Sequence, residues 1–428
     1  MNNGKVELLS PAGNLEKLKI AIKYGADAVY AGVSHFSLRI RAGKEFTFET
    51  FKEGIDYAHA HGKKVYATIN GFPFNSQIEL LKKHIATMAE LEPDGFIVAA
   101  PGVVKLCREI APQIDIHLST QANVLNYLDA QVFWDMGVKR IVVAREISLK
   151  DVVEIKKHLP DMEIEIFVHG SMCFAYSGRC LVSAVQMGRV PNRGSCANDC
   201  RFEYTLYAAN EDHGTLFRLE EEPGVGTYIF NSKDMNLASH IKEIMDSGAV
   251  DSLKIEGRTK SPYYAAVTAK AYRSAIDDYY DDKFEASKYQ RELYTTKNRG
   301  FTDAYLIHRP FEKADSQNHD YAQSKGSYEV TGLVTEDEEH FLCKYKVYPN
   351  EDIEIFTPMY EVLEECENEI GKIFKKDDIY YINFKKILTE TNKELESVHS
   401  GNVNKIKLPG KLPYLTMFRV ENATETIE

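Results

Sequence analysis

The sequence lacks the features that mark secreted and membrane proteins. No run of apolar residues approaches the roughly 18 that a membrane-spanning helix needs, and the polar start, Met1 to Lys5, leads directly into a strand-like segment at Val6. A secretory signal would place a longer apolar region there. The sequence therefore predicts a cytoplasmic protein without a membrane partner, in a compartment where structural disulfides are rare.

Several signatures of hydrolases and nucleotide-binding enzymes are also missing. There is no His-Glu-x-x-His motif of a zinc protease, no Gly-x-Ser-x-Gly turn of a serine hydrolase, and no glycine-rich phosphate turn after the first predicted strand. A positive balance is missing as well, because 52 Lys and Arg stand against 64 Asp and Glu, a net charge of −12. Nucleic-acid binders usually carry a basic balance, so composition disfavours RNA but allows a local basic patch.

Short strands alternate with helices over the first 280 of 428 residues. Gly25, Gly62 and Gly137 each stand between a helical segment and the next strand, as helix C-terminal caps should. Eight strand–helix units over about 250 residues predict a (β/α)8 TIM-like barrel at 1–280. A doubly wound sheet is the alternative, disfavoured by the missing phosphate turn. The expected strands are 6–9, 28–30, 64–69, 95–98, 115–118, 140–143, 164–168 and 252–255, and three of the expected helices are 15–24, 48–61 and 77–91.

Two further regions differ in pattern from the barrel. An insertion at about 170–235 contains period-two runs at 202–207 and 227–230 around an acidic turn, which predicts a hairpin at the barrel rim that could act as a lid. An insertion with only a packing role is the alternative. After a polar linker at 281–326, residues 327–428 alternate with period two, which predicts a small C-terminal antiparallel β-barrel.

The seven cysteines fall into two groups. Four follow the seventh predicted strand, and three are scattered in periodic segments and should be dispensable for metal binding. Zinc sites favour Cys-x2-4-Cys pairs, whereas the clustered four are separated by six, fifteen and three residues. Iron–sulfur clusters also take four thiolates, so spacing alone leaves a cluster and zinc open, with disulfides or purely packed thiols as further alternatives. The clustered cysteines are Cys173, Cys180, Cys196 and Cys200; the scattered ones are Cys107, Cys343 and Cys366.

Polar residues follow most of the predicted strand ends, where barrel enzymes carry their catalytic groups. A histidine there could shuttle a proton, and arginines suit fork-like binding of carboxylates. For each residue taken alone, a loop cap, an ion pair or an orienting histidine is the alternative. The catalytic candidates, from these ends and from the segment around the cysteines, are Gln121, Glu165, His169 and Glu256; the substrate-binding candidates are Asn70, Asn123, Arg145, Arg179, Asp234 and Arg258.

The run Glu165-x-Phe-x-x-Gly-Ser-Met-Cys-x6-Cys-x-x-Ser resembles the signature of the U32 peptidases, or collagenase-like proteases. Matching pieces elsewhere include Ser119-Thr-Gln-Ala-Asn-Val, Asn231-Ser-Lys-Asp and Leu253-Lys-Ile-Glu-Gly-Arg. Members of this family include enzymes that hydroxylate the wobble uridine of tRNA with oxygen taken from prephenate, and others that act on ribosomal RNA or ubiquinone precursors. In several members, cysteines at these positions hold a [4Fe–4S] cluster.

The resemblance implies an iron–sulfur-dependent tRNA hydroxylase that forms 5-hydroxyuridine, with tRNA as partner and prephenate, a small carboxylate, as co-substrate. It implies that Cys173, Cys180, Cys196 and Cys200 are the cluster ligands, with zinc as the alternative metal. A homo-oligomer, or a hetero-oligomer with a family paralogue, is compatible with it. A U32-type peptidase using Cys173 and His169 is the alternative function, and a non-catalytic RNA-binding scaffold is the third.

Overall fold

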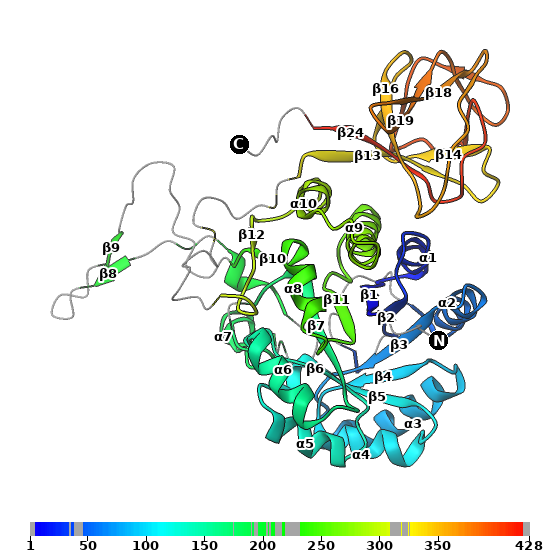
Figure 1. Ribbon diagram of the computed structural model, residues 1–428. Helices are drawn as coiled ribbons and strands as arrows, with labels where there is room; N and C mark the ends of the chain where they lie inside the picture. The colour runs from blue at the N-terminus through cyan, green and yellow to red at the C-terminus, as the bar shows by residue number, and fades with distance from the viewer. Residues whose placement is uncertain are drawn as a thin grey trace.

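Eight parallel strands form a closed barrel (Figure 1). The computed structural model describes residues 5–33, 36–37, 46–173, 175–189, 191, 196–202, 204, 207–209, 216–218, 232–308, 318, 324 and 326–422. The ring closes at β11, where Leu253 lies opposite Leu8 of β1 and Ile166 of β7. An open, doubly wound sheet has no such closing pair, so the (β/α)8 prediction is confirmed. The strands are β1 (Glu7–Pro11), β2 (Ala28–Ala31), β3 (Lys64–Ile69), β4 (Gly95–Val98), β5 (Asp115–Leu118), β6 (Arg140–Val142), β7 (Glu163–Ser171) and β11 (Ser252–Ile255).

Amphipathic helices cover the outside of the barrel and bury their apolar faces against its strands. Side-chain caps start them: Asn14 and Ser148 each accept a hydrogen bond from the N–H three residues later. Gly25, Gly62 and Gly137 follow helices with φ of 106°, 67° and 85°, where a Cβ would be strained. The helices are α1 (Leu15–Lys23), α2 (Phe48–Ala60), α3 (Ile78–Glu90), α4 (Pro101–Ile110), α5 (Tyr127–Asp135), α6 (Leu149–His158), α8 (Ile241–Asp246) and α9 (Pro262–Tyr280). In the described part of the chain, none is both long and apolar enough to cross a membrane.

The seventh strand runs beyond the barrel and carries the chain to the cysteines. β7 has nine residues, and its end pairs antiparallel with β10 (Asp234–Asn236), with Ser171 opposite Asp234 and His169 opposite Asn236. β12 (Phe301–Thr302) adds a further strand to this outer edge. Between β7 and β10 lie the short helix α7 (Val182–Met187) and the hairpin of β8 (Tyr207–Ala209) and β9 (Leu216–Arg218).

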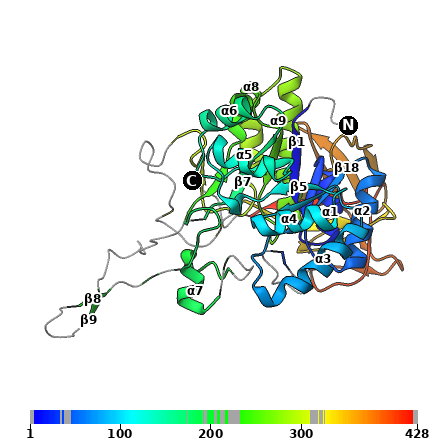
Figure 2. The same cartoon turned by 90° about the horizontal axis from the view of Figure 1, so that it is seen from below.

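The hairpin differs from the one that the sequence pattern predicted. β8 pairs antiparallel with β9, with Tyr207 opposite Arg218, whereas the sequence pattern paired 202–207 with 227–230. The expected second strand at 227–230 and the acidic run lie outside the described residues. In Figures 1 and 2 both strands project away from the barrel and do not cover its mouth.

The C-terminal region forms a separate curled antiparallel sheet with its own core, as predicted (Figure 1). Phe341 lies at its centre, with ring centroids 5.4 Å from Phe384 and 5.1 Å from Phe418. The sheet consists of β13 (Tyr328–Val334), β14 (His340–Cys343), β16 (Asp352–Phe356), β17 (Cys366–Glu367), β18 (Gly371–Lys376), β19 (Ile379–Phe384), β23 (Ile406–Lys407) and β24 (Met417–Glu421), and two small pairs flank it, β15 (Lys346–Val347) with β22 (Val398–His399) and β20 (Ile387–Leu388) with β21 (Glu394–Leu395).

The segment expected to be a polar linker, 281–326, contains a helix. α10 (Ala286–Tyr294) packs along α9, and β12 also falls in this range. α10 has nine residues, most of them polar, and buries only Tyr289 and Leu293. A tertiary contact with a longer helix stabilises it, which the local pattern could not reveal.

The C-terminal sheet is docked firmly on the barrel helices. The Tyr24 hydroxyl of α1 donates to the carbonyls of Phe356 and Leu415 at 2.9 and 3.0 Å. Arg419 of β24, buried, donates to the Glu292 carboxylate of α10 at 2.9 and 3.0 Å. α10 therefore joins the two domains through an ion pair that is buried on the Arg419 side and partly exposed on the Glu292 side.

Candidate functional site

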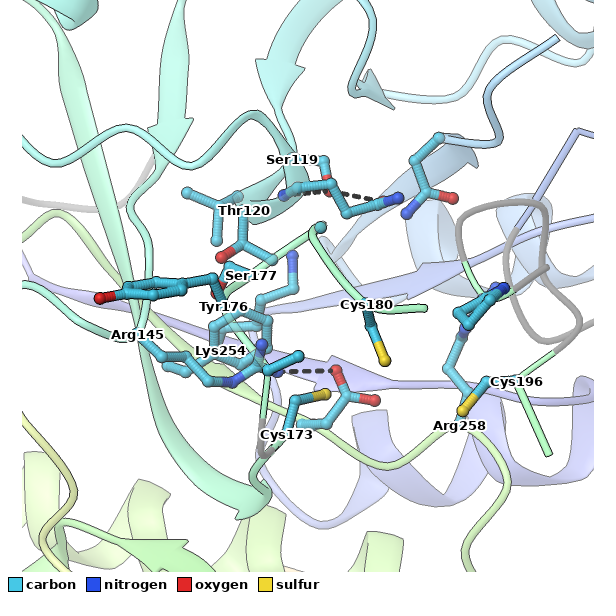
Figure 3. A pocket seen from close by; sticks show the side chains of 18 of the residues that line it. Ser119, Thr120, Arg145, Cys173, Tyr176, Ser177, Cys180, Cys196, Lys254 and Arg258 are labelled. Carbon is cyan, nitrogen blue, oxygen red and sulfur yellow. Dashed lines mark hydrogen bonds and ion pairs between the residues drawn. The ribbon is translucent and has the colours of Figure 1, made fainter. Parts of the chain in front are cut away.

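A pocket of about 180 Å³ opens at the carboxyl ends of the barrel strands (Figure 3). One part of its wall is the barrel mouth, and the other is the cysteine-rich segment that follows β7. The structure brings together at this pocket nine of the fourteen residues that the sequence singled out, namely Asn70, Gln121, Arg145, Cys173, Cys180, Cys196, Cys200, Glu256 and Arg258.

Cationic side chains form one side of the pocket. The Arg145 guanidinium stacks on the Phe167 ring, 3.8 Å from its centroid, and pairs with Glu256 at 3.4 Å. Arg258 donates to the hydroxyls of Ser37 and Thr68 at 2.9 and 3.2 Å. Four cationic residues, Arg145, Arg201, Lys254 and Arg258, line the pocket beside one carboxylate, Glu256, so the lining carries an excess of positive charge and suits an anionic ligand.

An amide side chain lies on another part of the wall. Gln121 follows β5, and the Ser119 hydroxyl donates to its Oε1 at 3.1 Å. The cysteine segment rests on this residue, since a Cβ at Gly178 would lie 2.3 Å from the Gln121 carbonyl oxygen, and Gly178 has φ of 73°. In Figure 3, Ser119 and Thr120 lie opposite Arg145 and Arg258, with Cys180 between them.

All four clustered cysteines line this pocket as free thiols, so the disulfide alternative is not what the structure contains. Burial raises the pKa of Cys180, and the neighbouring Cys173 and Cys196 raise it further. Burial also raises the pKa of Cys200, and the other three cysteines add to that rise. The donor set is therefore four thiols that line one pocket and influence one another's pKa, and thiols are the ligand type that iron–sulfur clusters and zinc take. In the part of the chain that the structure describes, no three His, Cys, Asp or Glu side chains surround a common point for one metal ion.

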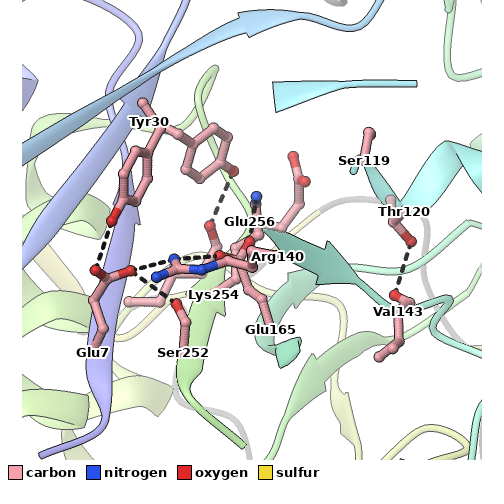
Figure 4. Close-up of polar contacts among 12 residues, drawn as sticks. Glu7, Tyr30, Ser119, Thr120, Arg140, Val143, Glu165, Ser252, Lys254 and Glu256 are labelled. Atoms are coloured by element: carbon pink, nitrogen blue, oxygen red, sulfur yellow. Dashed lines mark hydrogen bonds and ion pairs between the residues drawn. The ribbon is translucent and has the colours of Figure 1, made fainter. Parts of the chain in front are cut away.

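Beneath the pocket, buried charges fill the barrel interior (Figure 4). Arg140 Nη1 lies 2.5 Å from Glu7 and 3.1 Å from Glu165. Lys254 Nζ pairs with the other Glu165 oxygen at 2.7 Å. Burial alone would raise the pKa of Glu165, but the charges of Lys254 and Arg140 hold it below its ordinary value. Glu165 thus lies under the pocket wall as part of an ion-pair network, although the sequence placed it among the catalytic residues.

Four other candidates also lie outside the pocket lining. Arg179 is exposed. Asn123 adopts a left-handed conformation, φ 59°, at the end of the short 3-10 turn that holds Gln121. Asp234 is buried and ion-paired with Arg299 and, at 3.9 Å, with Lys260. His169, the fourth, is a buried residue within the extended part of β7.

The His169 ring is enclosed by aromatic side chains. It lies 5.3 to 5.8 Å, centroid to centroid, from Tyr264, Tyr272 and Phe301, and only 1% of the residue is exposed. Burial lowers its pKa to about 3, against a weaker opposing effect of Asp234. The imidazole is therefore neutral near pH 7, which fits an orienting histidine better than a proton shuttle.

The buried His169 should make the protein less stable in mild acid. Its unfolded pKa is near 6.5, so below about pH 6.5 the unfolded chain binds a proton that the folded chain does not. The free energy of unfolding should consequently decrease as the pH is lowered from about 6.5 to about 3. We expect His169→Gln to remove roughly 2 kcal/mol of the stability difference between pH 7 and pH 5, measured by urea unfolding. The exposed His399→Gln variant should keep the wild-type dependence; an unchanged dependence in His169→Gln would refute the assignment.

Sequence reasoning missed pocket residues that lie within strands, among them one lysine and two aromatic residues. Tyr30, Phe167 and Lys254 line the pocket, and Lys254 Nζ lies 4.5 Å from the Tyr30 ring centroid. Most of the candidates were taken from the residues that follow each predicted strand, so these three residues within the strands were not considered. The signal available was a lysine in an otherwise apolar strand, which requires a buried partner.

The sequence was compared with known protein families and proteins. A family model described as Peptidase family U32 matches residues 13–316, which span the barrel and the cysteine segment. The chain belongs to peptidase family U32. This U32 chain is 64% identical over 417 residues to tRNA hydroxylation protein P of Helicobacter pylori, covering 97% of this chain and 99% of the relative.

Other U32 relatives carry different names. tRNA hydroxylation protein P of Escherichia coli is 39% identical over 413 residues, covering 86% of this chain and 90% of that one. A protein named Collagenase from Porphyromonas gingivalis is 31% identical over 320 residues, covering 72% and 75%. The family thus includes proteins named for RNA hydroxylation and a protein named for proteolysis. The residues of the pocket are therefore the evidence that distinguishes these two activities for this chain.

Proposed function

We propose that this chain takes part in tRNA hydroxylation as an enzyme that forms 5-hydroxyuridine at the wobble position, and that the pocket is its active site. The observation that carries the proposal is the junction of four thiols and a cationic wall around one cavity. The names of the Helicobacter and Escherichia relatives, which match almost the whole chain, support the same activity.

Cys173, Cys180, Cys196 and Cys200 would hold a [4Fe–4S] cluster in this proposal. Each thiolate of such a cluster binds a different iron atom, so the sulfurs need not converge on one point as they do around zinc, the alternative metal. When bound, the cluster would supply one-electron redox chemistry at the cavity wall. The protein supplies the thiolates and shapes the cavity beside them.

The cationic wall would bind the oxygen donor, for which we propose prephenate. Prephenate carries two carboxylates, and Arg145, Lys254 and Arg258 all line the same cavity. Arg145 is held by Phe167 and Glu256, which fixes the guanidinium before the ligand arrives. A fixed guanidinium loses little side-chain entropy on binding a carboxylate, which favours this residue for the role.

A peptidase is the alternative that the family name and the Porphyromonas relative suggest. It would need Cys173 activated by a base such as His169. His169 is enclosed by Tyr264, Tyr272 and Phe301, while Cys173 is an exposed residue at the pocket. Nothing in the described geometry favours a cysteine–histidine pair, so hydroxylation remains the better account.

Complementation tests the proposal directly. In cells that lack the native gene, the wild-type chain should restore 5-hydroxyuridine in tRNA, read by mass spectrometry of digested nucleosides. The purified protein should leave casein and gelatin undigested. Restoration should fail in cells that also lack prephenate synthesis. Proteolysis without tRNA modification would overturn the proposal, and modification without prephenate would overturn the choice of oxygen donor.

A further inference from the structure

The amide nitrogen of Gln121 is a buried donor at the pocket. Gln121 is 7% exposed and lines the pocket, and among the residues that the structure describes its Nε2 has no hydrogen-bond partner. Leaving such a donor unsatisfied is unfavourable, and an ordered water or a ligand usually completes the bond. Because Gln121 lines the pocket, its donor is placed to bond an acceptor on a bound substrate.

Ser119 determines which end of the amide faces the cavity. Its Oγ accepts from the Gln121 backbone N–H at 3.5 Å, so the hydroxyl proton is available for Gln121 Oε1, 3.1 Å away. With Oε1 engaged, Nε2 is left for the ligand. The choice between the two ends follows from the hydrogen-bond network, as it does for any glutamine.

The position of the amide selects the kind of acceptor. The cations Arg145, Lys254 and Arg258 already provide for carboxylates, whereas Gln121 offers a neutral N–H2 group in a pocket that is also lined by the apolar side chains of Ile97 and Val142. A neutral carbonyl is the acceptor that such a group matches without leaving a charge unpaired. In uracil the O4 carbonyl is an acceptor, where cytosine carries the N4 amino donor.

We propose that Gln121 reads the O4 carbonyl of the target uracil and so selects uridine over cytidine. The inference rests on the proposed hydroxylation of uridine. C5, the atom to be hydroxylated, is bonded to C4 in the ring, so a base held by O4 presents C5 close to Gln121. The same residue contacts the cysteine segment through Gly178, where a Cβ would lie 2.3 Å from the Gln121 carbonyl oxygen. The proposed contact to the base and the cysteine segment therefore lie next to each other in the pocket.

Two variants test this reading in deletion cells that carry the full-length protein. Gln121→Glu keeps an oxygen for the Ser119 hydroxyl but replaces the donor by an acceptor, and Gln121→Met removes the donor at similar volume. Each strain also expresses a reporter tRNA with cytidine at the target position, and 5-hydroxyuridine and 5-hydroxycytidine are both quantified. Protein level and melting temperature of each variant are measured alongside.

We expect Gln121→Glu to lower 5-hydroxyuridine by about a hundredfold and Gln121→Met by about tenfold, since a site built to bond a substrate group discriminates strongly once that bond is lost. The ratio of hydroxycytidine to hydroxyuridine should rise in Gln121→Glu. A merely structural role would lower both products in parallel, and that result, or unchanged hydroxyuridine in both variants, would overturn the inference. If wild type forms no hydroxyuridine, the proposed function itself fails.

Discussion

Cys180→Ser should remove bound iron and abolish 5-hydroxyuridine formation. Cys180 is a half-buried thiol on the pocket wall, close enough to Cys173 and Cys196 for their charges to affect its pKa. Serine cannot replace it, because iron–sulfur clusters are held by thiolates. Loss of an outer-shell partner alone lowers metal affinity or activity about tenfold to a hundredfold, so loss of a ligand should exceed a hundredfold.

Iron content and visible absorbance after anaerobic purification measure this outcome. Wild type should bind about four iron atoms per chain, and Cys180→Ser should bind substantially fewer. The control is Cys366→Ser, a half-buried thiol of the C-terminal sheet whose Sγ faces the Pro409 carbonyl at 3.6 Å. It should keep iron and activity. Stoichiometric zinc with no iron in wild type, or full iron in Cys180→Ser, would contradict the cluster assignment.

Glu165→Gln should destabilise the barrel by about 3–5 kcal/mol, the usual cost of breaking a buried ion pair. Glu165 is fully buried and bonds both Lys254 at 2.7 Å and Arg140 at 3.1 Å. An amide would remove the carboxylate that pairs with the buried Lys254, whereas Arg140 would keep Glu7 and Glu163. Because the Glu165 pKa is lowered in the folded state, its contribution is present above the unfolded pKa and is lost as pH falls through the folded value.

Glu163→Gln is the matched control. Glu163 bonds the same Arg140 at 2.7 Å, but its side chain is 32% exposed, so solvent screens the pair. We expect a loss within about 1 kcal/mol, as for surface pairs. Urea unfolding of both variants at pH 7 makes the comparison. A catalytic Glu165, as the sequence suggested, would instead give a stable protein that makes no 5-hydroxyuridine.

The regular part of the fold could be predicted from local pattern. Strand and helix alternation identified the eight barrel strands within one or two residues at most ends, since each element buries a face of characteristic period. The hairpin and α10 could not be predicted in this way. β8 and β9 have three residues each, and α10 is a nine-residue, mostly polar helix that buries only Tyr289 and Leu293, so these elements are too short and too polar to stand out in the sequence.

The candidate site was predicted in part for the same reason. Residues past strand ends meet at one rim in any barrel, which is why Gln121, Arg145 and Glu256 line one pocket. Sequence position does not say which way a side chain within a strand points relative to a ligand. Lys254 therefore went unnoticed at the pocket, and Glu165 was given a catalytic role that its ion pairs do not suggest.

The sequence alone determined the barrel, the C-terminal sheet and the grouping of the four cysteines, because these follow from local periodicity and from spacing along the chain. Only the tertiary structure decided that the thiols share a cavity with Arg145 and Arg258 and that His169 is enclosed by aromatic rings. It also decided that the Gln121 amide donor has no partner within the described part of the chain. These are relations between side chains that are distant in the chain. Burial and pairing set their charges and hydrogen bonds, and neither exists until the barrel closes.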